Sequence, residues 1–149
     1  MNWDIVVTPL LTTLSGVLVF VIGQIILECY IKPLQEYHKI KSEISFLLVL
    51  YANVYMNPEI YGENKGALYT TKEKERRIIA EKELREAAAK LIGIKQQKPL
   101  LVKKDDITEA SANLIGLSNG LYSSVTNQEI QMKENELCRK KIKKSLHLK

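Results

Sequence analysis

The sequence predicts an all-α protein with a single N-terminal transmembrane helix and a small helical cytoplasmic domain. The 149-residue chain has an uncharged run from Val6 to Leu27, which suffices to cross a hydrocarbon core of about 30 Å at 1.5 Å per residue. The following segments repeat apolar residues at helical spacing. No alternating strand pattern exceeds four residues, apart from an ambiguous stretch over residues 100–102.

The N-terminal span is expected to be retained rather than cleaved as a signal peptide. Its start has no basic n-region, the apolar run exceeds an h-region, and no small-x-small cleavage site follows. Asp4 is the only charged side chain before the run, whereas Lys32, Lys39 and Lys41 follow it. The positive-inside rule therefore predicts an external N-terminus and a cytoplasmic C-terminus.

The span has two different faces. Small and polar residues gather on one side, namely Thr12, Gly16, Gly23, Gln24 and Glu28, and the opposite side is uniformly apolar. Because lipid provides no hydrophobic drive for helix association, such a face indicates close packing against a helix of another subunit, or a pore lining. Two interpretations of Glu28 stay open: it reaches the aqueous interface, or it serves a pore mouth or subunit contact.

Helices are predicted throughout the cytoplasmic part. Pro33 is suited to the first turn of a helix over 33–56, which runs on from the span with a kink. A loop follows at 61–69. A capping box at Thr70 and Glu73 begins a helix over 70–92, and a further helix covers 106–121. The last helix starts at Thr126 and runs into a basic tail.

These elements divide the chain into three parts: the membrane segment 1–31, a helical sensor and oligomerisation domain 32–138, and the tail 139–149. A domain of this size is marginal as a monomeric core, so oligomerisation would help it. Residues 45–56 are apolar nearly all round. At this length they predict a buried core helix or an interfacial segment rather than a second span.

The net charge of +5 is concentrated in the tail, which holds six basic residues and no acid: Arg139, Lys140, Lys141, Lys143, Lys144 and Lys149. Such a run attracts anionic lipid or nucleic-acid phosphates. The alternative is a frayed, solvated helix end. The tail lacks interleaved aromatic residues, so specific recognition of a DNA or RNA duplex is not expected.

A second basic cluster begins the helix over 70–92. Arg76 and Arg77 supply planar guanidinium groups that suit phosphate, and seven tyrosines in the chain offer stacking surfaces for bases. The cluster also contains glutamates, and an ordinary solvated helix face has the same composition.

Small residues recur every fourth position at Ala112, Gly116 and Gly120. Glycine inside a helix lowers stability by about 1 kcal/mol relative to alanine, so the pattern needs a reason. Close helix crossing is one reason. A ligand pocket is the other, in which nearby polar groups would contact a nucleobase edge: Asn113, Ser118 and Asn119.

Catalysis is not expected. The histidines His38 and His147 lie far apart, and the chain has no HExxH, GxSxG, P-loop or GxGxxG motif. No metal site or cofactor is predicted. Cys29 and Cys138 do not form a disulfide framework in a reducing compartment; Cys138, beside a basic residue, is either a thiol of lowered pKa or an inert one.

Two blocks carry a family resemblance. The stretch from Gly23 to Tyr55 and the stretch LIGLSNGLY, Leu114 to Tyr122, resemble small bacterial membrane proteins with one N-terminal span and a helical cytoplasmic domain. Size, order of parts and orientation resemble the membrane-anchored accessory effectors of type III CRISPR systems. The resemblance implies a homotetramer in the bacterial inner membrane that binds cyclic tetra-adenylate across its symmetry axis and rearranges its membrane helices.

The resulting hypothesis is a ligand-gated, membrane-perturbing antiviral defence protein, in which Arg76, Arg77, Asn113, Ser118 and Asn119 contact the ligand. Two other classes stay open. A membrane-anchored scaffold for a protein partner predicts no nucleotide binding, and an ungated, holin-like channel predicts toxicity without any signal. All three classes require the same two-faced helix, so the sequence does not separate them.

Overall fold

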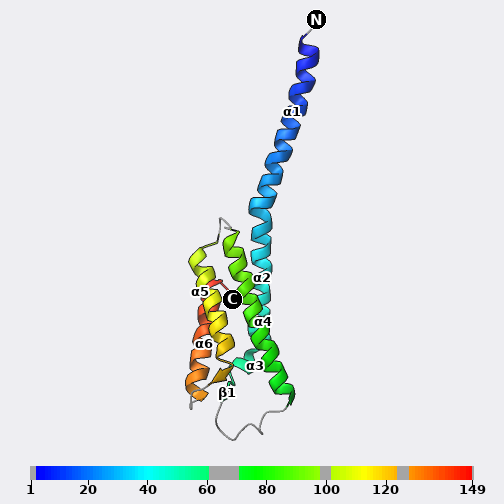
Figure 1. Ribbon diagram of the computed structural model, residues 1–149. Helices are drawn as coiled ribbons and strands as arrows, with labels where there is room; N and C mark the ends of the chain where they lie inside the picture. Colours follow the sequence, from blue (N-terminus) through cyan, green and yellow to red (C-terminus); the bar gives the residue numbers. More distant parts are fainter. Residues whose placement is uncertain (1–2, 61–70, 98–101, 124–127, 149) are drawn as a thin grey trace.

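A continuous helical rod forms the first part of the molecule (Figure 1). The computed structural model describes residues 3–60, 71–97, 102–123 and 128–148. The rod consists of α1 (Trp3–Ile26), the π-helical turn η1 (Leu27–Ile31) and α2 (Lys32–Leu50). At 1.5 Å per residue it is about 70 Å long. Figure 1 shows α1 projecting away from all other elements, whereas α2 lies beside α4.

The rod contains the candidate membrane span. Among the described residues, one helix is long and apolar enough to cross a membrane, and the apolar part of that helix has no buried residue. An apolar surface with no protein cover is what a helix surrounded by lipid requires. The predicted fold class, a long apolar N-terminal helix followed by a small helical domain, is confirmed.

Pro33 explains the π turn. A proline has no N–H to donate, and its ring clashes with the carbonyl group four residues earlier, here that of Cys29. The rod accommodates Pro33 by widening over Leu27–Ile31, where the N–H of Lys32 bonds to the carbonyl oxygen of Leu27, five residues back. The irregularity predicted at Pro33 therefore takes the form of one π-helical turn within an uninterrupted rod.

Four helices form the bundle. From α2, the chain returns along α4 (Thr71–Gln96), then runs along α5 (Lys104–Asn119) and finally along α6 (Gln128–Ser145), each helix antiparallel to the one before it (Figure 1). All four contribute apolar side chains to one core, including Ile44, Leu84, Leu91, Ile107, Leu114 and Ile142, which are fully buried. The rod thus contains the candidate membrane span and also forms one wall of this core.

The end of the bundle farthest from α1 has a compact corner. The predicted helix over 33–56 breaks at Tyr51, and a short helix α3 (Ala52–Tyr55) follows. Two-residue strands then pair in parallel, β1 (Glu59–Ile60) with β2 (Tyr122–Ser123), in a register that sets Glu59 opposite Tyr122. A strand of two residues has no recognisable periodicity, which is why the sequence does not predict it.

The tail differs from the prediction. Helix α6 runs without interruption from Gln128 to Ser145, and Ile142 and Leu146 are fully buried in the core. Residues 139–148 are therefore continuous with the bundle, and the frayed-end alternative is wrong for them. An apolar residue every fourth position anchors this segment, while its lysines remain on the outer side.

Other predicted boundaries shift by a few residues. Helix α4 continues to Gln96, four residues beyond the prediction, and α5 begins at Lys104 rather than at Asp106. Asp106 lies in the first turn, where a carboxylate complements the helix dipole. The predicted loop at 61–69 and the predicted helix starts at Thr70 and Thr126 lie outside the described residues, as does the side chain of Asp4.

Candidate functional site

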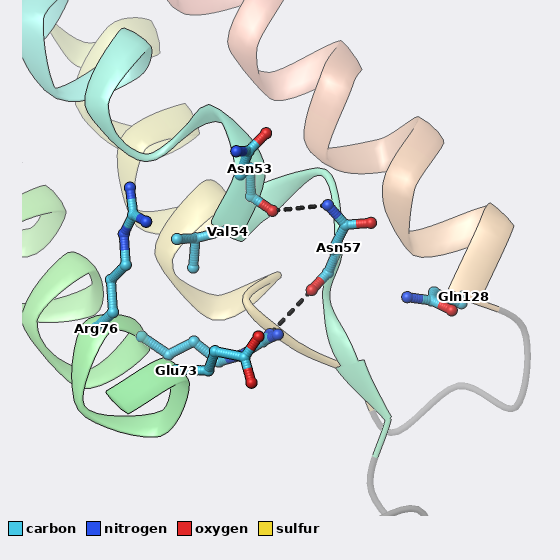
Figure 2. A pocket seen from close by; sticks show the side chains of 7 residues that line it. Asn53, Val54, Asn57, Glu73, Arg76 and Gln128 are labelled. Atoms are coloured by element: carbon cyan, nitrogen blue, oxygen red, sulfur yellow. Dashed lines mark hydrogen bonds between the residues drawn. The ribbon is translucent and has the colours of Figure 1, made fainter. Parts of the chain in front are cut away.

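The candidate site is a polar cavity of about 570 Å³ at the end of the bundle farthest from α1 (Figure 2). This volume lies within the range of small-molecule pockets, about 300–1,000 Å³. Its walls come from the α2–α3 corner, the first turns of α4 and the start of α6. The lining residues are Asn53, Val54, Asn57, Glu73, Arg76, Arg77 and Gln128.

Arg77 connects two walls of the cavity. Its side chain is almost fully buried, and Nη1 donates a hydrogen bond of 2.9 Å to the carbonyl oxygen of Asn57. Its Nε lies 3.7 Å from Oε2 of Glu59 at the start of β1. A buried arginine held by a carbonyl and a carboxylate fixes α4 to the segment that follows α3. Arg77 therefore has a structural role in addition to its place in the lining.

Arg76 is exposed and joins the cavity to the rod. Its Nη2 donates a 3.0 Å hydrogen bond to the carbonyl oxygen of Leu50, the last residue of α2. The next residue, Tyr51, is buried and donates its hydroxyl to Oε2 of Glu83 at 2.9 Å. Burial, supported by that hydrogen bond, raises the pKa of Tyr51 to about 12, and the nearby Arg76 charge partly opposes the rise.

Amide groups cover the remaining wall. Nδ2 of Asn57 donates to the carbonyl oxygen of Asn53 at 2.9 Å, and Nε2 of Gln128 donates to that of Pro58 at 3.3 Å. Both amide oxygens are further acceptors, and Glu73 contributes a carboxylate between the arginine and amide sides (Figure 2). The lining combines guanidinium, amide and carboxylate groups. It suits a polar ligand with both anionic and hydrogen-bond-donating parts.

Only two of the five predicted ligand residues, Arg76 and Arg77, line this cavity. Asn113 is half-buried and its Nδ2 donates to the carbonyl oxygen of Glu109 one turn earlier, while the hydroxyl of the buried Ser118 donates to that of Ile115. The Oδ1 of Asn119 accepts a 2.9 Å bond from Nη2 of Arg85. In the single chain, α5 turns these three groups toward other surroundings and away from the cavity. Their contact with a ligand stays a prediction.

Close helix crossing accounts for the glycines of α5. A methyl group added at Gly116 would lie 3.3 Å from Sγ of Cys138, and one at Gly120 would lie 1.9 Å from Oδ1 of Asn135. The partner helix is α6, so the crossing interpretation is confirmed at these two positions. Cys138 is half-buried, and burial raises the pKa of its thiol, which excludes the predicted alternative of a lowered pKa.

Asn135 joins several elements of the bundle, although nothing in its sequence context indicates this role. It is 1% exposed, and its Nδ2 donates to the carbonyl oxygens of Tyr55 at 2.7 Å and Gly120 at 2.8 Å. One amide thus joins α6 to the end of α3 and to the end of α5. In the sequence it appears as one more polar residue in a charged helix, which gives no indication of burial.

Hydroxyl groups on the polar face of the span bond within their own helix. Oγ1 of Thr12 donates to the carbonyl of Thr8, and Oγ1 of Thr13 donates to that of Pro9. Glu28 pairs with Lys32 one turn later, and both side chains are more than half exposed. Glu28 therefore has a partner within the same chain.

Gly16 and Gly23 have open space around them, since an added methyl group would meet no atom within 4 Å at either position. Gln24 is exposed. In the single chain these three residues of the predicted packing face are free of contacts from other elements.

The residues that the structure describes form a helical bundle preceded by one candidate membrane helix. The described residues contain no group of three or more His, Cys, Asp or Glu side chains that could hold a metal ion. No family model, no curated protein and no solved structure matches the chain.

Proposed function

We propose that this protein is a membrane-anchored effector whose distal cavity binds a nucleotide second messenger and transmits binding along the rod to the membrane helices. The messenger proposed is a cyclic oligoadenylate, and the assembly a tetramer in a bacterial inner membrane with cytoplasmic bundles. The resemblance to accessory effectors of type III CRISPR systems supports an antiviral role. The observation that carries the proposal is the direct bond between a cavity residue, Arg76, and the last carbonyl of α2.

The lining chemistry supports this class of ligand. A phosphodiester carries a single negative charge, which an exposed guanidinium can meet by paired hydrogen bonds. The amides of Asn57 and Gln128 match the edge of a nucleobase. Glu73 would repel a polyphosphate, but it can accept a hydrogen bond from the amino group of adenine. The set therefore favours a phosphodiester-linked adenine nucleotide over a free phosphate or a nucleoside triphosphate.

The position of Arg76 supports coupling to the membrane. A phosphodiester that draws the guanidinium into the cavity competes with the Leu50 carbonyl oxygen for the same N–H group. The end of the rod then loses its hydrogen bond to Arg76 of α4. A ligand shifts an equilibrium between two arrangements only by its difference in affinity for them, and this exchange of partners is one source of such a difference.

The test uses the full chain in lipid nanodiscs, titrated with cyclic tetra-adenylate and followed by thermal unfolding. Linear tetra-adenylate, a cyclic dinucleotide and ATP serve as comparators. A ligand that binds only the folded protein stabilises it by about 2.7 kcal/mol at 100 times its Kd. We expect a selective upward shift of Tm with the cyclic oligoadenylate.

Matched arginine variants then locate the site. Arg76→Ala should raise the Kd for cyclic tetra-adenylate about tenfold or more. A tenfold change corresponds to about 1.4 kcal/mol, the size of one lost hydrogen bond to a charged group. Arg85→Ala, an exposed arginine of the same helix on another face, should bind as the wild type does. The absence of a shift with every nucleotide would contradict the proposal and favour a scaffold or an ungated channel.

A further inference from the structure

The outer side of α2 carries an uncharged surface with exposed apolar residues. Phe46 is 61% exposed and Val49 is 76% exposed, although both lie beyond the uncharged run, in the helix α2 that packs against α4. Ser42, which is also exposed, lies one turn before Phe46 on the same face. No member of this face from Ser42 to Val49 is charged, in a protein of which 26% of the residues are charged.

The π turn brings this surface into line with the small-residue face of the span. Gly23 and Ser42 are nineteen positions apart. Because η1 inserts one extra residue into the helical repeat, the rotation corresponds to about eighteen α-helical residues, or about five whole turns at 3.6 residues per turn. Val49 follows Ser42 at two turns. One straight face therefore runs from Gly16 and Gly23 through Ser42 to Val49.

The chemistry of this face fits a second copy of the same chain. Copies anchored in one membrane with the same orientation lie parallel around a symmetry axis, so residues of a face turned toward this axis meet their own counterparts. A charged residue would then face the same charge, whereas Ser42, Phe46 and Val49 are compatible with themselves. In water, burying Phe46 and Val49 would add hydrophobic stabilisation, and in lipid the open positions at Gly16 and Gly23 permit close approach of two backbones.

We propose that the subunits of this protein associate along one continuous face, from Gly16 in the membrane to Val49 near the end of α2. The π turn keeps the membrane half and the water half of this face on one side of the rod. Asn53, in α3 just beyond the end of α2, lines the cavity. The proposal rests on the membrane anchoring in the proposed function but not on any ligand, and it sets the cavity close to the end of the subunit contact.

Disulfide cross-linking in membranes tests the face directly. Cys29 and Cys138 are first replaced by serine in the full chain. Val49→Cys should then give a covalent dimer on oxidation without any nucleotide present. The matched control is Lys82→Cys, since the Lys82 side chain is also 76% exposed but lies on α4. No dimer at Val49→Cys, or equal dimer at both positions, would overturn the proposal.

A charge placed on the same face provides a second measurement. Val49→Lys sets like charges opposite each other in parallel copies, so the mass of the detergent-solubilised complex should fall toward that of a monomer. Ile78→Lys, at a 60% exposed position of α4, should leave the mass unchanged. An unaltered mass for Val49→Lys would contradict the proposed face, whereas a failure of nucleotide binding with cross-linking intact would contradict only the proposed ligand.

Discussion

Replacing Asn135 by alanine should destabilise the bundle more than any exposed substitution. The side chain is 1% exposed, and its Nδ2 bonds to the carbonyl oxygens of Tyr55 at 2.7 Å and Gly120 at 2.8 Å. Alanine would leave both oxygens without this donor in a place that water does not reach. Each buried polar group left unsatisfied costs about 1–3 kcal/mol. The expected loss is therefore about 2–6 kcal/mol, a large part of the 5–15 kcal/mol typical of a domain.

The assay is urea unfolding of the full chain in detergent micelles, followed by far-UV circular dichroism. Asn113→Ala is the matched control, because Asn113 is only half-buried and its Nδ2 bonds to the Glu109 carbonyl within its own helix. That control should change the free energy of unfolding by no more than about 0.5 kcal/mol. If both variants unfold at the same urea concentration, the inference that the Asn135 amide joins three helices is refuted.

Two further predictions use the same unfolding assay. Gly120→Ala should lower the free energy of unfolding by about 1–3 kcal/mol, because the new methyl group would lie 1.9 Å from Oδ1 of Asn135. Gly93→Ala, where an added methyl group meets no atom within 4 Å, should raise it by up to about 1 kcal/mol. Equal effects of the two substitutions would contradict the close crossing of α5 and α6. The pKa of Tyr51 is raised from 10.0 to about 12 in the folded protein. As pH rises, the unfolded chain therefore loses the hydroxyl proton of Tyr51 at a lower pH than the folded protein does. The free energy of unfolding should therefore fall as pH rises from 10 toward 12, and Tyr51→Phe should make this fall less steep. An unchanged slope in the variant would contradict the prediction.

The sequence predicts the helices well because their signals are local. Apolar spacing identifies α2, α4 and α5, and the uncharged run identifies α1. The break at Tyr51 and the pairing of Glu59 with Tyr122 depend on contacts between distant segments, so no local sequence pattern predicts them. The core position of Ile142 and Leu146 is visible as helical spacing, but the surrounding lysines obscure it.

The candidate site is predicted only in part for a related reason. Arg76 and Arg77 attract notice as adjacent guanidinium groups at the start of a helix, and both line the cavity. Glu73 lies in the same helix, but the remaining polar residues come from the α2–α3 corner and from the start of α6, which the fold brings together across more than fifty positions of sequence. Asn113 and Ser118 are adjacent to the small-residue pattern, yet their direction depends on how α5 packs, and this is a property of the tertiary structure.

If the candidate span crosses a membrane and ends near Ile31, the straight course of α2 fixes the height of the cavity above that membrane. The end of α2 at Leu50, to which Arg76 of the cavity bonds, stands about 30 Å farther along at 1.5 Å per residue, with no flexible linker between them. The negative surface potential of a cytoplasmic leaflet decays over a screening length of about 8 Å at physiological salt. An anion that enters the cavity is therefore several screening lengths away from lipid charge. Its affinity should depend on the cavity residues and hardly at all on the fraction of anionic lipid beneath them.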